Sequence, residues 1–152
     1  MPTTRVETGL QYAALPWRER DGRLEILLIT SRQSKRWIIP KGWPIEDLAP
    51  HASAEQEAME EAGIVGRISP TVLGSFYYAK GLKSGRSIQC KVIVFPLAVT
   101  RMRRDWPEKN ARELRWHTPQ EAVEAVAETD LRLLIRRFVR QHHAVAQTPA
   151  GK

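Results

Sequence analysis

The chain has 152 residues, and 24 lysines and arginines against 17 aspartates and glutamates give it a formal net charge of +7. Apolar residues make up 42% and charged residues 27%, which is typical of a globular domain and excludes a disordered chain. The single cysteine, Cys90, excludes an internal disulfide and a multi-cysteine zinc site, and no apolar run approaches the length of a membrane span. We therefore expect one domain in the cytoplasm, without membrane contact, whose basic charge favours an anionic partner.

Short apolar runs and turn residues organise the first half of the chain. After an arm at residues 1–8 that we expect to be flexible, apolar and aromatic runs predict strands at residues 11–17, 24–30 and 37–39. Asp21-Gly22, between the first two, is typical of a two-residue hairpin turn, and Pro40 ends the third because proline has no backbone N–H to donate. The alanines and glutamates of residues 52–62 predict the clearest helix, and Gly63 follows at the position of a C-terminal cap.

The second half of the chain predicts a hairpin, a short strand and two helices. The strands are expected at residues 72–79, 88–99 and 114–117. The polar, glycine-rich link at residues 80–86 predicts a long hairpin between the first two. A helix is expected over residues 119–127, and a last helix over 131–141 has an apolar stripe at i, i+3, i+4 and i+7 spacing. With one domain at residues 9–142 and a disordered tail at 143–152, this order of elements predicts a mixed α/β fold.

Three glutamates on the central helix are the most informative residues. Glu57, Glu60 and Glu61 are spaced i, i+3 and i+4, so they share one helix face, where like charges repel by about 0.2–0.5 kcal/mol per pair. They also lie in the last turns before Gly63, where the helix dipole disfavours anions. A solvated helix face is the ordinary interpretation of such a set. A bound cation would offset both penalties, and a hard cation such as Mg²⁺ takes carboxylate oxygens together with phosphates.

The glutamates belong to a longer motif. Residues 42–64 resemble the Nudix box, Gly-x5-Glu-x7-Arg-Glu-U-x-Glu-Glu-x-Gly-U, in which U is an aliphatic residue. The residues that match are Gly42, Glu57, Glu60, Glu61, Gly63 and Ile64. Two positions differ, because Leu48 stands in place of the first glutamate and Gln56 in place of the arginine. In the family this arginine pairs with a box glutamate, whereas the amide of Gln56 can form a hydrogen bond without a charge.

Further segments resemble one branch of this family, the diphosphoinositol polyphosphate phosphohydrolases. The residues that support this resemblance are 31–32, 36–40, 60–63, 105–108, 112 and 115–116. The resemblance covers about residues 9–140, and it implies a Nudix-like α/β/α sandwich with a mixed β-sheet. It also implies a hydrolase of diphosphate linkages that depends on Mg²⁺, with Mn²⁺ as an alternative metal.

The roles that the resemblance implies fall on the glutamate helix and the loop before it. Glu57 and Glu61 would be Mg²⁺ ligands, joined by the backbone carbonyl of Lys41. Glu60 would act either as the general base toward water or as a further metal ligand, and Glu57 is assigned with it to the catalytic group. The chemistry needs this set because a metal neutralises the charge that develops at the bridging oxygens while a carboxylate accepts a proton from water.

Residues around this helix are candidates for holding substrate phosphates, because arginine can bind phosphate through two donors. The residues to which we assign this role are Arg32, Arg36, Lys41, Gly42, Lys83, Arg86 and Arg112. The alternative is that the charged members are ordinary solvated side chains. Arg132, Arg136 and Arg140 line one face of the last helix, as either a solvated face or a footprint for RNA or polyphosphate.

Two functions of different classes are consistent with these features. The first is a hydrolase of diphosphate linkages in a diphosphoinositol polyphosphate, a dinucleoside polyphosphate such as diadenosine polyphosphate, or inorganic polyphosphate. The second is a catalytically weak module that binds RNA or a polyphosphate ligand, which Leu48, Gln56 and the basic last helix favour. Three retained glutamates that repel one another favour the enzyme, with a phosphorylated small molecule rather than nucleic acid as its partner. The substrate and the oligomeric state stay open at this point.

Overall fold

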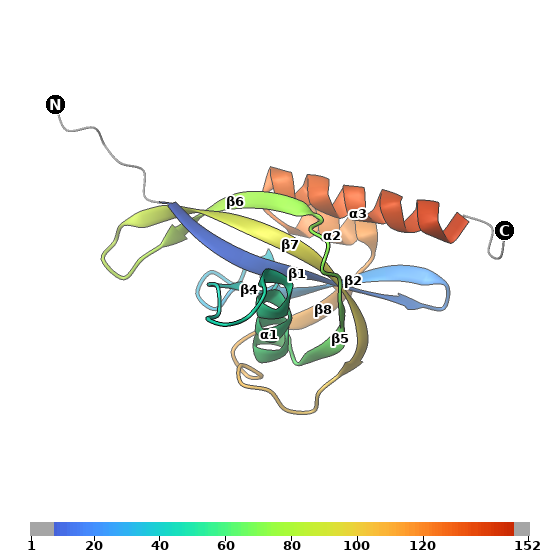
Figure 1. Cartoon of the computed structure of the whole chain (residues 1–152), viewed down its shortest axis with the longest axis horizontal. Helices are drawn as coiled ribbons and strands as arrows, with labels where there is room; N and C mark the ends of the chain where they lie inside the picture. The colour runs from blue at the N-terminus through green and yellow to red at the C-terminus, as the bar shows by residue number, and fades with distance from the viewer. Residues whose placement is uncertain (1–7, 148–152) are drawn as a thin grey trace.

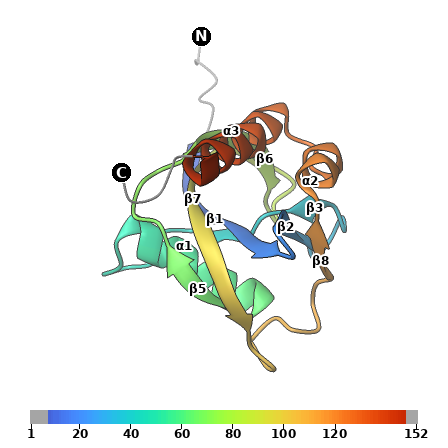
Figure 2. The same ribbon diagram turned by 90° about the vertical axis from the view of Figure 1, so that its right-hand side faces the viewer.

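The computed structural model describes residues 8–147, and within them the backbone forms eight strands and three helices. In chain order these are β1 (Thr8–Arg20), β2 (Arg23–Thr30), β3 (Trp37–Ile38), β4 (Lys41–Gly42), α1 (Pro50–Ala62), β5 (Ile64–Ile68), β6 (Gly74–Gly81), β7 (Ser87–Met102), β8 (Leu114–His117), α2 (Pro119–Ala125) and α3 (Thr129–Gln147). Figure 1 and Figure 2 show α1 against one face of the sheet and α2 and α3 against the other. The expected α/β/α sandwich is therefore confirmed.

The long strands β1 and β7 form the centre of a mixed sheet. They run parallel, from Thr8 opposite Gln89 to Trp17 opposite Ala98, while β1 is antiparallel to β2 and β4. The strand order is β3-β2-β1-β7-β5, with β6 paired to β7 and β8 paired to β2. Because the pairing with β7 extends to Thr8, the strand starts one residue inside the arm expected at residues 1–8. Residues 1–7 lie outside the described part of the chain.

Each face of the sheet buries its own apolar cluster. Ala54, Ala58 and Ala62 of α1 are fully buried against one face. On the other face, α3 buries its predicted stripe, including Leu131 and Ile135. Alanine side chains are small, so α1 lies close to the sheet, and its glutamates on the neighbouring helix face can reach β4.

The predicted turns and caps around α1 and β1 are confirmed. The two-residue turn between β1 and β2 has positive φ at both positions, +53° at Asp21 and +75° at Gly22, which suits the twist of hairpin strands. Helix α1 starts at Pro50, whose fixed φ favours a first helical position. It ends at Gly63, which has φ +68° and donates its N–H to the carbonyl of Met59 at 2.9 Å.

Three elements differ from the sequence-based expectation, and the first is the short strand β4, because no strand was expected at residues 41–42. Strand β5 was not predicted, because its five residues include a glycine and an arginine, and it forms only by pairing with the end of β7.

Helix α3 continues to Gln147, beyond the end expected near residue 141 and into the tail expected to be disordered from 143. Its last turns are tied to the β1–β2 hairpin, because His142 Nε2 lies 2.6 Å from Glu19 Oε1 and its ring packs on Trp17. Residues 148–152 lie outside the described part.

Gly63 allows a test of the packing at the end of α1. A Cβ atom at this position would overlap the ring of Trp106, whereas a Cβ atom at Gly22 would meet nothing within 4 Å. Both glycines have positive φ, so alanine strains the backbone similarly at both, by about 1–2 kcal/mol. We expect Gly63→Ala to lower the free energy of unfolding by about 1–3 kcal/mol more than Gly22→Ala, as overpacking does. Urea unfolding followed by circular dichroism measures the difference, and equal losses would contradict the role of Trp106.

Candidate functional site

Strand β4 brings residues 41–42 against the glutamate helix. It pairs with the middle of β1, with Lys41 opposite Ala13 and Gly42 opposite Tyr12. A Cβ atom at position 42 would overlap the carboxylate of Glu57. The close approach of the Glu57 side chain, rather than an unusual backbone conformation, therefore requires glycine at position 42.

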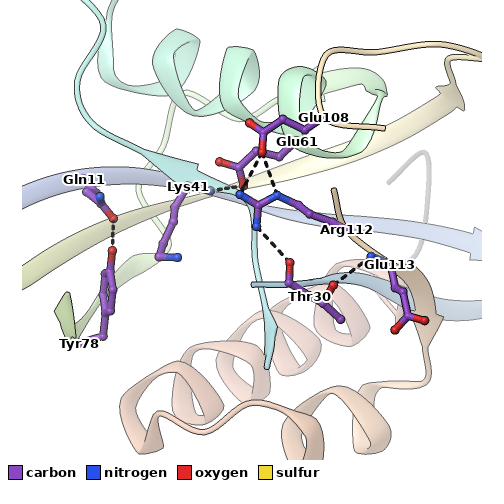
Figure 3. Close-up of polar contacts among 8 residues, drawn as sticks. All are labelled: Gln11, Thr30, Lys41, Glu61, Tyr78, Glu108, Arg112 and Glu113. Atoms are coloured by element: carbon purple, nitrogen blue, oxygen red, sulfur yellow. Dashed lines mark hydrogen bonds and ion pairs between the residues drawn. The ribbon is translucent and has the colours of Figure 1, made fainter. Parts of the chain in front are cut away.

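Glu61 is the buried carboxylate of the site, with 5% of its surface exposed. Its Oε1 accepts the backbone N–H of Lys41 at 3.4 Å and lies 3.8 Å from Nη2 of Arg112 (Figure 3). Burial raises the pKa of Glu61 to about 8, although the charges of Arg112 and Lys41 act in the opposite direction. The positive charges already present thus do not compensate for the burial of this carboxylate.

The other two glutamates are held differently. Burial raises the pKa of Glu57 above its usual value, and the charge of Glu60 adds to the shift. Glu60 accepts a hydrogen bond from Nε2 of Gln56 at 3.1 Å, so the amide supplies the hydrogen bond that we expected of it. Among the residues that the structure describes, no three His, Cys, Asp or Glu side chains lie close enough to form a metal site.

The residues present fit a hard divalent cation. The donors near β4 are oxygens, the type that Mg²⁺ and Mn²⁺ prefer. The missing side chain of Gly42 gives the Glu57 carboxylate its place beside the strand. The pKa of Glu61 stays raised although Arg112 and Lys41 are nearby. A further positive charge, such as a divalent cation, would favour the ionised form of Glu61. Glu57 and Glu61 are accordingly the two side chains best placed to hold the ion.

A basic pocket of about 840 Å³ is lined by Lys41 and Arg112, the two residues that contact Glu61. Loop residues after β2, the strand β6 with the link after it, and the start of α3 form its walls. Six basic side chains line it, and these are Arg32, Arg36, Lys41, Lys80, Lys83 and Arg112. Glu128 is the one carboxylate among the described lining residues, and it lies 3.8 Å from Nη1 of Arg36. A pocket with this charge can bind a ligand with several phosphates.

The structure brings most of the predicted phosphate-binding residues into this pocket. Five of them line it, and these are Arg32, Arg36, Lys41, Lys83 and Arg112. Gly42 lies instead against Glu57, on the α1 side of β4. Arg86 belongs to the link between β6 and β7, and it is not among the lining residues. Five of the seven residues assigned to phosphate binding therefore line one pocket, and the phosphate-binding role of all seven stays a prediction.

Three residues of the site were not predicted from the sequence. Phe76, Tyr78 and Lys80 are spaced two residues apart in β6, so their side chains lie on the same face of the strand. This spacing could have placed Lys80 on the pocket face. Glu128 had no such signal, because it reaches the pocket only through the tertiary fold. Glu108 lies in the segment 105–108 that supports the family resemblance, but no role was assigned to it. Glu108 lies in the loop between β7 and β8, and its carboxylate contacts Arg112.

Lys41 connects the pocket with the carboxylates. Its backbone N–H faces Glu61, and its Nζ lies 4.8 Å from the ring centroid of Tyr78. Tyr78 is held in turn by a 2.7 Å hydrogen bond from its hydroxyl to Oε1 of Gln11 (Figure 3). Burial lowers the pKa of Lys41, and the charge of Glu61 opposes this shift. The backbone of Lys41 therefore faces the carboxylate of Glu61, while its side chain lies over the ring of Tyr78 in the wall of the pocket.

Replacement of Gly42 tests whether the β4–Glu57 contact forms part of a metal site. We expect Gly42→Ala to displace the Glu57 carboxylate and to weaken Mn²⁺ binding by about tenfold or more, as loss of supporting contacts does at metal sites. Electron paramagnetic resonance of free Mn²⁺ measures the affinity. Gly22→Ala in the distant β1–β2 turn is the control, because it strains the backbone without approaching the site. Unchanged affinity in Gly42→Ala would remove Glu57 from the ligand set.

The raised pKa of Glu61 predicts how stability depends on pH in the cation-free protein. With a pKa of about 8 in the folded state against 4.5 in the unfolded chain, Glu61 holds a proton in the folded state over that interval. The free energy of unfolding in EDTA should therefore fall, on the order of 1 kcal/mol or more, as pH rises from about 5 to 8. Urea titrations should show a smaller fall in Glu61→Gln. An equal fall in both proteins would contradict the burial of this charge.

Comparisons with known proteins agree with this geometry. The NUDIX domain model matches residues 9–141. Nudix hydrolase 12, mitochondrial, of Arabidopsis thaliana is 31% identical over 121 residues, which are 78% of this chain and 60% of the relative. Diphosphoinositol polyphosphate phosphohydrolase 3-alpha of Mus musculus is 30% identical over 105 residues, which are 67% of this chain and 60% of the relative. The chain thus spans about three fifths of the length of these relatives.

Solved structures support the same fold. A Caenorhabditis elegans Ap4A hydrolase in a binary complex superposes with a TM-score of 0.68 at 19% identity, over 90% of this chain and 98% of the other. A MutT protein from Methanosarcina mazei superposes with a TM-score of 0.66 at 20% identity, over 92% and 99% of the two chains. With the family model matched over most of its length, the chain belongs to the Nudix family.

Proposed function

We propose that this chain is a hydrolase of diphosphate linkages that uses a divalent cation and acts on a highly anionic substrate. The observation that supports it most is the position of the basic pocket, which adjoins the buried Glu61 through Lys41 and Arg112. Ligand phosphates held by the pocket would lie next to the carboxylates that can hold the ion. Membership of the Nudix family and the hydrolases among its relatives support the same reaction.

The positions of the residues support one assignment of roles. Glu57 and Glu61 would hold the ion, Mg²⁺ or Mn²⁺, together with the backbone carbonyl of Lys41. When bound, the ion supplies positive charge for the phosphate oxygens on either side of the breaking bond. Glu60, oriented by Gln56, accepts the proton of the attacking water. Arg32, Arg36, Lys80 and Lys83 grip the other phosphates from the pocket walls.

The charge of the pocket favours a substrate with many phosphates. Six basic side chains against one carboxylate exceed what a single diphosphate needs. The mouse relative is named for diphosphoinositol polyphosphates, and a structural neighbour is an Ap4A hydrolase. We therefore rank a diphosphoinositol polyphosphate first, followed by dinucleoside polyphosphates and inorganic polyphosphate. A phosphate-release screen over these three classes, with Mg²⁺ and Mn²⁺, tests the order.

A second candidate is a catalytically weak module that binds RNA or polyphosphate. The observation that favours it is the hydrogen bond of Gln56 to Glu60, which lacks the charge of the family's arginine. Arg136 and Arg140 are exposed on α3, where they could contact a nucleic acid backbone. Salt-dependent binding of RNA by a chain that hydrolyses none of the three substrate classes would support this alternative.

The cytoplasmic location expected from the sequence stays a prediction. No helix within residues 8–147 is long and apolar enough to cross a membrane. Several relatives are named as mitochondrial or chloroplastic. Fractionation of cells that express a tagged chain tests the location directly.

Neutral replacements of the carboxylates test the enzyme hypothesis. We expect Glu57→Gln and Glu61→Gln each to lower kcat by at least about 100-fold, because each removes a charge that the reaction needs while keeping the side-chain shape. Glu55→Gln, on the same helix, is the matched control and should keep turnover within about twofold. Substrate titrations with Mg²⁺ present give kcat and KM for each protein. Near-normal turnover in both test variants would rule out their role at the metal.

A further inference from the structure

Arg112 lies where the carboxylates and the basic pocket meet. Its side chain is 10% exposed and contacts partners on three sides. Nη2 lies 3.8 Å from Oε1 of Glu61, and Nε and Nη2 both lie 3.2 Å from Oε1 of Glu108 (Figure 3). Nη1 donates to the carbonyl of Thr30 at 3.0 Å. One guanidinium therefore joins α1, the loop before β8 and the end of β2.

This position creates a conflict when a divalent ion binds. A guanidinium does not lose its proton, so an arginine side chain that is only 10% exposed needs an anion beside it at all times. Glu108 is one such anion, and Glu61 is a second whenever its carboxyl is ionised. A divalent ion bound to Glu61 would neutralise the carboxylate and repel the guanidinium of Arg112. Arg112 must then either leave the site or be held by another group.

Glu108 is placed to be that other group. Its Oε1 accepts a hydrogen bond from Nε of Arg112 and forms an ion pair with Nη2, and its side chain is 27% exposed. Its backbone N–H donates to the carbonyl of Glu60 at 3.0 Å, which fixes the loop to the end of α1. Trp106, two residues earlier, packs against Gly63 and fixes the same loop a second time.

We propose that Arg112 is the counter-cation of Glu61 when this carboxyl is ionised and no divalent ion is bound, and that Glu108 is the positioning residue that keeps Arg112 at the pocket edge when a divalent ion binds Glu61. The inference rests on the proposed function, since it assumes that Glu57 and Glu61 hold a cation. The new element is competition for Glu61, in which the divalent ion displaces the positive charge of Arg112.

The proposal predicts opposite changes in cation affinity for two neutral replacements. Arg112→Gln removes the competing charge, so Mn²⁺ should bind about tenfold tighter. Glu108→Gln removes the anchor, so Arg112 turns to Glu61 and Mn²⁺ should bind about threefold or more weaker. If Glu108 acts through Arg112, its replacement should change the affinity by less than about twofold when Arg112→Gln is already present.

Mn²⁺ titrations followed by electron paramagnetic resonance test these changes on the full chain without substrate. The control is Arg115→Gln, which removes an exposed positive charge three residues away and should leave the affinity within about twofold. Tighter binding by Arg112→Gln, with no further effect of Glu108→Gln, supports the proposal. Weaker or equal binding by Arg112→Gln overturns it, and so does an undiminished effect of Glu108→Gln, which would make Glu108 a direct ligand.

A second measurement does not depend on the folding of Arg112→Gln. The Nε–H of Arg112 donates to Glu108, so its proton NMR signal, assigned by its loss in Arg112→Lys, should survive saturation with Mg²⁺ in the wild-type chain. In Glu108→Gln the signal should disappear when Mg²⁺ is added. Loss of the signal in the wild-type chain would overturn the proposal.

The two titrations also separate this inference from the proposed function. A wild-type chain that binds no Mn²⁺ at millimolar concentration refutes both, because no cation then replaces Arg112 at Glu61. A wild-type chain that binds Mn²⁺ and hydrolyses diphosphates, while Arg112→Gln binds no tighter, refutes the counter-cation role alone.

Discussion

The buried carboxyl group of Glu61 is the constraint around which the site is built. A carboxyl group with 5% exposure needs polar partners, and the fold supplies two of them, the backbone N–H of Lys41 in β4 and the guanidinium of Arg112 in the loop before β8. Neither donor belongs to α1. The helix can therefore hold its carboxylates in place only when the sheet is complete, which links the stability of the domain to its charge chemistry.

The topology of the sheet makes that arrangement possible. Strand β1 pairs with β2 through a tight turn, with β4 through residues 41–42 and with β7 in parallel. Strand β1 thus positions Gly42, against which Glu57 packs, and through β7 it positions the β6–β7 hairpin that bears Lys80. The small alanines on the buried face of α1 let the helix lie close to the sheet.

The pocket shows how a charged surface is assembled from distant segments. Its basic side chains come from the loop after β2, from β4, from β6 and its link, and from the loop before β8. Each would be an ordinary solvated charge if its segment were considered alone. Gathered around one space, they repel one another, and an anionic ligand relieves that repulsion. Glu128 beside Arg36 relieves part of it within the protein itself.

The sequence by itself determined the local features: the turn at Asp21-Gly22, the helix that ends at Gly63, the apolar stripe of α3 and the spacing of the box glutamates. These depend on neighbours within a few residues, so local propensity and periodicity are sufficient. Only the tertiary structure decided that β5 is a strand, that Arg86 lies outside the pocket, and that Glu108 contacts Arg112. Those features depend on a partner strand or a charge far away in the chain, and no local pattern encodes such a partner.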